Sequence, residues 1–193
     1  KCIGENEEAE HNKWYAYVKT FEDSPRYNNQ AYVDTLSKEA IDKFIEVTHE
    51  AYKKHVGDEF SKTIPSIFCD EPQFSTKETI ENSRECTSVK YPWTPLLPEK
   101  YMQRYGRDIK TTLPEIFWDL PNGKPSRARY LYHDIICELF TSSFMDNCGK
   151  WCEENGIALT GHVMEEATLK SQTCVVGEAM RTYRSMGIPG IDM

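Results

Sequence analysis

The stretch that decides the fold is TIPSIFC at residues 63–69, followed at once by DEP at residues 70–72. A short run rich in β-branched and aromatic side chains is typical of a buried strand. We therefore predict a strand that delivers Asp70 and Glu71 at its carboxyl end. Because side chains alternate along a strand, we expect these two acids to point to opposite faces, with only one of them directed fully into a shared site.

The same pattern of an apolar run followed by acids recurs further along the chain. Residues 157–163, IALTGHV, predict a second buried strand, and Glu165 and Glu166 follow it. Residues 187–193, GIPGIDM, resemble the opening of a third strand with Asp192 at its end. Asp34 lies at the expected end of an earlier strand, just before a helix start at Ser37.

Helices are expected between these strands. Ser37 is the predicted N-cap of a helix that ends at Gly57, since a serine hydroxyl satisfies free amide groups at a helix start. A long helix with an apolar stripe is predicted over residues 128–155, and shorter ones over 98–105 and 177–186. Residues 73–127, rich in proline and aromatic residues, predict a long loop and short-helix excursion.

Strands that alternate with helices favour a parallel sheet or barrel, because parallel neighbours need a long crossover connection. Acids at the strand ends favour an α/β fold of the (β/α)₈ TIM type, whose sites are assembled there. We expect three to four βα units within residues 1–193, forming a single incomplete catalytic barrel domain. A full barrel takes about 250 residues. Together with a start at Lys1 rather than Met, this suggests a fragment of a larger enzyme.

The composition excludes several classes of protein. The chain has 193 residues, with 23 Lys and Arg against 31 Asp and Glu and a net charge of −8, which excludes a basic nucleic-acid reader. A hydrophobic content of 39% supports a packed core, and no apolar run approaches the length of a membrane span. The seven cysteines form no zinc-binding pattern, and we expect them to be thiols.

Acids at neighbouring strand ends suit the cleavage of a glycosidic bond. This reaction needs one protonated carboxyl to protonate the leaving oxygen and a second carboxylate as base or nucleophile. Glu71 is the candidate acid, and Glu165 or Glu166 is the candidate second carboxylate. The spacing alone leaves a capping or structural role open for all three.

Other side chains near these acids have more than one interpretation. His162 could bind a sugar hydroxyl, ligate a metal or form a hydrogen bond in the core. The aromatic residues of the excursion could stack on the apolar face of a sugar ring or simply pack its loops. These residues are Tyr91, Trp93, Phe117 and Trp118.

Four stretches in series resemble the catalytic barrel of glycoside hydrolases like the α-L-rhamnosidases of family 106. They are YVDTL at 32–36, IPSIFCDEP at 64–72, GIALTGH at 156–162 with the acids that follow it, and IPGID at 188–192. The resemblance implies inverting hydrolysis of α-L-rhamnosides or related glycosides in plant or microbial polysaccharides. It is more specific for this wider group of enzymes than for rhamnose as the sugar.

The same resemblance implies roles for individual residues. Glu71 would be the general acid, and Glu165 or Glu166 the base. Calcium lies near the site in some relatives, although its ligands do not map onto any cluster of this sequence, and no other cofactor is expected. The expected substrate-binding or supporting residues are Asp34, Asp70, Trp93, His162 and Asp192.

Two other classes of function stay open. One is a non-catalytic carbohydrate-binding or assembly module, and the other is a metal-dependent hydrolase. The metal-dependent hydrolase would use Asp70, Glu71, His162, Glu165 and Asp192.

The expected partners follow from the same reasoning. They are an oligosaccharide or polysaccharide and, because a half barrel exposes sheet edges, the remainder of the polypeptide or a second copy of the chain. Activity of the piece alone and its location cannot be read from the sequence. Secretion or a periplasmic location is compatible with the parent enzyme.

Overall fold

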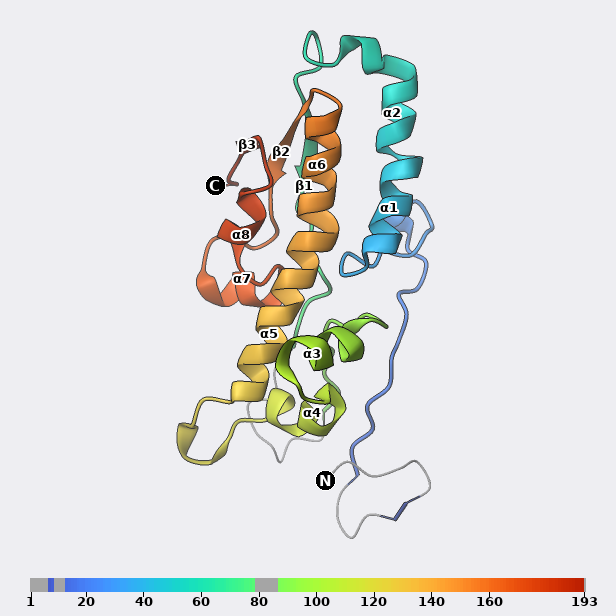
Figure 1. Cartoon of the computed structure of the whole chain (residues 1–193). Helices are drawn as coiled ribbons and strands as arrows, with labels where there is room; N and C mark the ends of the chain where they lie inside the picture. The colour runs from blue at the N-terminus through green and yellow to red at the C-terminus, as the bar shows by residue number, and fades with distance from the viewer. Residues whose placement is uncertain (1–6, 9–12, 79–86, 193) are drawn as a thin grey trace.

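The computed structural model describes residues 7–8, 13–78 and 87–192 (Figure 1). A π-helical turn, Thr141–Met145, joins α5 to α6, and short 3₁₀ turns lie at Pro25–Tyr27, Gly57–Glu59 and Pro121–Gly123. The strands are β1 (Ser66–Asp70), β2 (Ala158–His162) and β3 (Ile188–Pro189). The helices are α1 (Lys38–Val47), α2 (His49–Val56), α3 (Leu97–Tyr105), α4 (Ile109–Phe117), α5 (Arg127–Phe140), α6 (Asp146–Glu154), α7 (Leu169–Val175) and α8 (Ala179–Tyr183).

The strands of the described residues form one small parallel sheet in the order β1-β2-β3. The register pairs Asp70 with His162 across β1 and β2, and Thr160 with Ile188 across β2 and β3. Helices separate the strands along the chain, as parallel pairing requires. The fold is therefore of the α/β type, and the carboxyl ends of all three strands lie at one edge of the sheet.

Helices cover one face of this sheet. The long helix formed by α5, the π turn and α6 lies along it and supplies much of the core, including Ile135, Phe140 and Phe144 (Figure 1). Side chains that point to the other face are open to solvent: Phe68 is 61% exposed and Ile188 is 52% exposed. The sheet is thus packed on one side only.

The long helix and the helix after Ser37 differ in small ways from the sequence predictions. The predicted helix at 128–155 is observed over 127–154, with the π turn inside it. The helix after Ser37 is observed as α1 and α2, which meet at Thr48, where φ is −110° and the hydroxyl donates to the carbonyl of Phe44.

Two connections hold more helix than the sequence predicted. The excursion at 73–127 contains α3 and α4, where one short helix was expected. Helix α7 was not predicted, and it begins at a capping box formed by Thr168 and Ser171.

The strand expected to end at Asp34 is not formed within residues 31–36. This segment is tied to the chain beyond β1 by side chains instead of a backbone ladder. The hydroxyls of Tyr32 and Thr35 both donate to the carbonyl of Gln73. The described residues therefore contain three βα strands, and the strand of a fourth βα unit is not found among them.

The described cysteines are free thiols, as the sequence predicted, and the described helices are too short or too polar to cross a membrane. Cys69, Cys137, Cys148, Cys152 and Cys174 are free thiols, and the other two cysteines lie outside the described residues. Burial raises the pKa of the Cys69 thiol to about 12 and that of Cys152 to about 11. In the part of the chain that the structure describes, no helix is long and apolar enough to cross a membrane.

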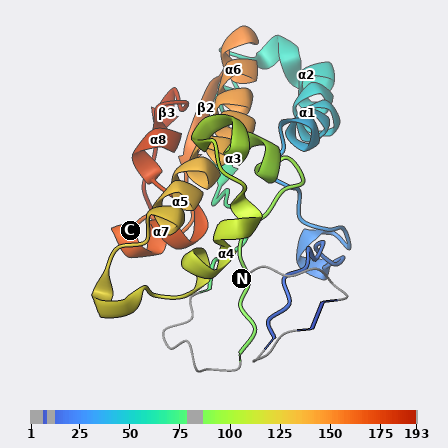
Figure 2. The same ribbon diagram turned by 60° about the horizontal axis from the view of Figure 1, so that its bottom comes forward.

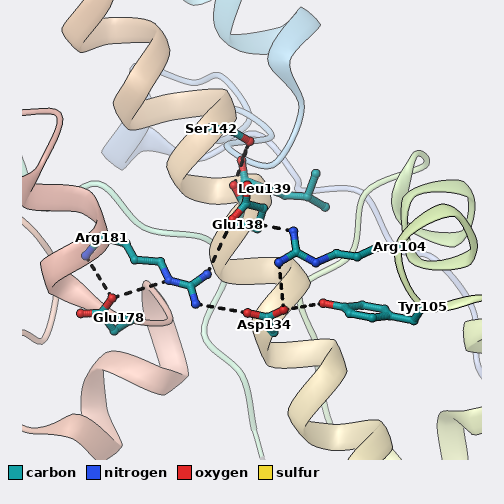
Figure 3. Close-up of polar contacts among 8 residues, drawn as sticks. All are labelled: Arg104, Tyr105, Asp134, Glu138, Leu139, Ser142, Glu178 and Arg181. Atoms are coloured by element: carbon teal, nitrogen blue, oxygen red, sulfur yellow. Dashed lines mark hydrogen bonds and ion pairs between the residues drawn. The ribbon is translucent and has the colours of Figure 1, made fainter.

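A polar network around Asp134 joins three helices that are distant in sequence (Figure 3). The Asp134 carboxylate of α5 accepts hydrogen bonds from Tyr105 at 2.6 Å, Arg104 at 3.2 Å and Arg181 at 3.2 Å. The same two arginines pair with Glu138 one turn further along. Along the chain, helix α3 belongs to the connection from β1 to β2, and helix α8 to the connection from β2 to β3. Through Asp134, both connections are fastened to α5 (Figure 2).

A second buried polar contact holds the start of the excursion. The Lys77 ammonium donates a 2.8 Å hydrogen bond to Nε2 of His133 on α5, and the Lys77 amide donates to the carbonyl of Cys174. Burial, with nearby Lys77 and Arg129, lowers the pKa of His133 to about 3. The neutral imidazole is therefore the acceptor that the buried lysine needs.

The sheet depends on a close backbone approach at Gly161. Its φ is +137°, and a Cβ atom there would lie 2.0 Å from the carbonyl oxygen of Cys69. The Gly161 carbonyl in turn accepts a 2.8 Å hydrogen bond from the amide of Gly190. Only a residue without a side chain lets the ends of β1 and β2 meet in this way.

We expect Gly161→Ala to lower the free energy of unfolding by about 2–5 kcal/mol, since the methyl group adds both backbone strain and a clash. Urea denaturation followed by circular dichroism measures it. Gly106→Ala is the matched control, because Gly106 also has a positive φ, +65°, but open space around the added Cβ. Gly106→Ala should lower the free energy of unfolding by about 1 kcal/mol. Equal losses in the two variants would contradict the role given to the close approach.

The His133 contact predicts a pH dependence. His133 titrates near 6.5 when unfolded and near 3 when folded, so the unfolded state binds more protons between these values. The contribution of His133 to the free energy of unfolding is fully present above pH 6.5. It falls as the pH drops toward 3, by up to about 1.4 kcal/mol per pH unit. His133→Gln keeps an acceptor for Lys77 and should flatten the dependence, whereas exposed His55→Gln should not. Unfolding measured from pH 4 to 8 tests this, and parallel profiles for wild type and His133→Gln would refute it.

Candidate functional site

Three side chains from the carboxyl ends of the three strands converge at one edge of the sheet. They are Glu71, directly after β1, His162, the last residue of β2, and Asp192, just beyond β3. One potential ligand atom of each lies within 4.8 Å of those of the other two. We call this group the strand-end triad. Glu71 and His162 are partly buried, and Asp192 is exposed.

Asp70 and Glu71 were expected to point to opposite faces, with one of them in the site. Glu71 belongs to the triad, whereas the Asp70 side chain is 77% exposed. Strand alternation is not the reason, because Glu71 adopts a left-handed φ of +49° and the strand geometry ends with Asp70. The Glu71 amide donates to the carbonyl of His162, which holds this turn in place. Both acids therefore lie near His162. A left-handed non-glycine residue costs about 1–2 kcal/mol, and such strain is common at functional sites.

The side chain of His162, the last residue of β2, contacts Asp70 and Phe68. Its Nε2 lies 3.3 Å from an Asp70 carboxylate oxygen, and its side chain is only 14% exposed, whereas that of Asp70 is 77% exposed. The ring of Phe68 contacts the imidazole edge-on at 5.7 Å. The other ring nitrogen, Nδ1, is buried and has no hydrogen-bond partner in the described structure.

The two acids that follow β2 have different surroundings. The Glu166 carboxylate is partly buried and accepts hydrogen bonds from the amides of Val163 and Asp192 and from the hydroxyl of Tyr183. Burial and this contact raise the pKa of Tyr183. Glu165 is exposed and has a left-handed φ of +54°. Glu166 thus links the end of β2 to the segment that carries Asp192.

Asp34 and Trp93 lie together in a small hollow. Its cavity volume is only about 20 Å³, and it is lined by Phe21, Tyr32 and Phe74 besides these two residues. The Asp34 carboxylate accepts bonds from the Thr94 hydroxyl at 2.7 Å and from the Leu36 amide at 3.0 Å. Phe74 follows Glu71 by three residues, a span of at most about 11 Å.

The other aromatic candidates of the excursion pack against aromatic side chains and the core. Tyr91 and Phe117 form an edge-on pair at 4.6 Å and lie against the core. Trp118 contacts Trp14 edge-on at 4.8 Å. Of the four aromatic candidates, Trp93 alone lines the hollow among the described residues.

Sequence reasoning missed several residues of the site. The hydroxyl of Tyr183 reaches Glu166 across 17 residues, and no spacing rule predicts that contact. Gly161 and Gly190 were parts of quoted motifs but were given no role. A glycine within a strand, which marks a close backbone approach, was the available signal for Gly161.

A search of solved structures finds a rhamnosidase from Novosphingobium sp. PP1Y at a TM-score of 0.55. The match has 18% sequence identity and covers 81% of this chain and 13% of that chain. The chain resembles part of a rhamnosidase fold. At this identity the likeness shows the fold alone, and the chain spans a small share of the other protein's length. No protein-family model matches the chain, and no curated protein does.

We predict that Glu166 holds the strand ends together. Glu166→Gln keeps the size of the side chain but removes the charge and half of its acceptor capacity. The amides of Val163 and Asp192 should then exchange with solvent deuterium about tenfold faster. Amide exchange followed by NMR measures this, with the exposed Glu165→Gln as control. Unchanged exchange of both amides in Glu166→Gln would show that these hydrogen bonds are unimportant.

Proposed function

We propose that the chain is part of a glycoside hydrolase and contributes carboxylates to the hydrolysis of α-L-rhamnosides or related glycosides. The observation that carries the proposal is the convergence of Glu71, His162 and Asp192 at the carboxyl ends of parallel strands. Sites of α/β barrels are assembled at these ends. The likeness to part of a rhamnosidase supports the same choice.

In this proposal Glu71 protonates the leaving oxygen, and a carboxylate after β2 activates water for inversion. The surroundings favour Glu165 as the base, because the Glu166 carboxylate already accepts three hydrogen bonds. Glu166 then positions Asp192. Inversion requires about 6.5–9.5 Å between the acid and the base, whereas about 5–5.5 Å would favour retention.

The remaining candidates suit the binding of a sugar. Asp70, His162 and Asp192 present oxygen and nitrogen atoms to hydroxyl groups at the edge of the sheet. Trp93 and Asp34 line the small hollow, which would have to widen before the Trp93 ring could stack on the apolar face of a sugar. The proposed substrate is an oligosaccharide or polysaccharide bound at the triad.

We further propose that the sheet is part of a (β/α)₈ barrel completed by other strands. Its outer face carries exposed Phe68 and Ile188, and both of its edge strands lack a further neighbour among the described residues. Open edges and apolar faces favour association. The completing strands would come from the rest of a longer polypeptide or from a second copy.

A non-catalytic carbohydrate-binding module is the second candidate function. The strand-end triad is compatible with it, since two carboxylates and an imidazole can bind sugar hydroxyls without acting as an acid and a base. Calorimetry with rhamnose-containing oligosaccharides, run beside a hydrolysis assay, separates the two functions. Heat of binding without any turnover would favour the binding module.

Glu71→Gln should lower the hydrolysis of an aryl α-L-rhamnoside by about 100-fold or more, since the amide cannot protonate the leaving oxygen. Release of the aryl group measures the rate, both for the 193-residue chain alone and for the longer polypeptide that contains it. Glu153→Gln on the exposed side of α6 is the matched control and should keep full activity. Undiminished turnover in folded Glu71→Gln would overturn the role of Glu71.

A further inference from the structure

The strand-end triad brings together the donors of a metal site. Glu71 and Asp192 each offer a carboxylate oxygen and His162 offers a ring nitrogen, and these atoms lie within 4.8 Å of one another. Ligands on opposite sides of one ion lie about 4–4.6 Å apart, at about 2.0–2.3 Å from the metal. Small side-chain movements would therefore bring all three into one coordination sphere.

Backbone contacts hold this arrangement in place. Gly161 and Gly190 allow the three strand ends to approach, through the hydrogen bond from the Gly190 amide to the Gly161 carbonyl. Glu166 holds the amide of Asp192, and the left-handed turn of Glu71 is fixed by the carbonyl of His162. A site whose ligands are held beforehand binds a metal at a lower cost in ordering.

The imidazole gives a second, independent sign of a ligand. His162 Nδ1 is buried without a hydrogen-bond partner, and a buried polar atom left unpaired costs about 1–3 kcal/mol. The second nitrogen, Nε2, lies 3.3 Å from the exposed Asp70 carboxylate. A histidine that binds a metal commonly uses one nitrogen for the metal and gives the other to a carboxylate.

This donor set does not fit calcium well. Ca²⁺ takes six to eight oxygen ligands and rarely a nitrogen, whereas the triad has two carboxylates and an imidazole. The Glu166 carboxylate, which follows β2, is already occupied by three hydrogen bonds. Imidazole combined with carboxylates suits Zn²⁺, Co²⁺ or Fe²⁺.

We propose that Glu71, His162 and Asp192 form a binding site for a first-row divalent transition metal ion, Zn²⁺ or Co²⁺, in preference to Ca²⁺. The site stands on its own geometry and does not depend on the proposed glycoside hydrolysis, since a Glu71 carboxylate that binds a metal ion is not at the same time a protonated general acid. It replaces the calcium expected from the family resemblance with a different class of ion. A chain that binds the metal and hydrolyses no glycoside would still fulfil this proposal.

Thiols are the other groups that could take these metals, and three of them are poorly suited. Cys69 is partly buried in β1, and Cys148 and Cys152 are buried in the core, where burial raises the pKa of both thiols. Metal binding needs the thiolate. Cobalt reports any such binding directly, because a thiolate ligand gives a charge-transfer band that carboxylates and imidazole do not give.

The test is calorimetric titration of the full 193-residue chain with CoCl₂, ZnCl₂ and CaCl₂ in turn. We expect Co²⁺ and Zn²⁺ to bind at one site at least tenfold more tightly than Ca²⁺, with a cobalt visible spectrum that lacks the thiolate band. His162→Asn, Glu71→Gln and Asp192→Asn should each weaken Co²⁺ binding by about tenfold or more. The matched controls His55→Asn, Glu153→Gln and Asp58→Asn change exposed residues of the same types and should leave it unchanged.

A measurement on the unaltered protein keeps the test independent of variant folding. Bound Co²⁺ should shift or broaden the NMR signals of the His162 ring and leave those of the His55 ring in place. Calcium binding as tight as cobalt binding would overturn the preference. Absence of Co²⁺ binding, or binding that spares the His162 signals, would overturn the site itself. Loss of glycoside hydrolysis alone bears on the proposed function and not on this site.

Discussion

The structure depends on the contact between the backbone of Gly161 and the carbonyl of Cys69. There the ends of β1 and β2 approach more closely than any side chain would allow, and Gly190 joins from the third strand through a hydrogen bond to Gly161. The two glycines and the turn at Glu71 together bring three chemically useful side chains to one point. The site is therefore a consequence of how the sheet ends, and the long helix supports it by filling the covered face with apolar side chains.

The parts of the fold that the sequence predicts are those with a strong local pattern. The runs at 64–69 and 157–163 are apolar and short, and both contain strands. The stripe from Tyr132 to Cys152 predicts the long helix almost to the residue. The start at Ser37 is capped as expected, since the serine hydroxyl accepts from the Ala40 amide.

The parts that could not be predicted depend on contacts between distant segments. The left-handed turn of Glu71 is held by the carbonyl of His162, 91 residues later in the chain, so strand alternation does not apply to Glu71. The segment before Asp34 looked like a strand, but its hydroxyls bind the chain beyond β1 in place of a ladder. Helix α7 begins at a capping box formed by Thr168 and Ser171, but the usual sequence signature has Glu or Gln in place of Ser171, so the sequence gives only a weak signal for it.

The Asp134 network has a consequence for how the molecule opens. Helices α3 and α8 belong to the two connections that lead into β2 and β3, and both are tied to the same carboxylate on α5 (Figure 3). Segments that share a partner in this way lose their order together rather than one after the other. The two connections therefore form one cooperative unit with α5, and the strand ends that carry the site should become ordered or disordered in a single step.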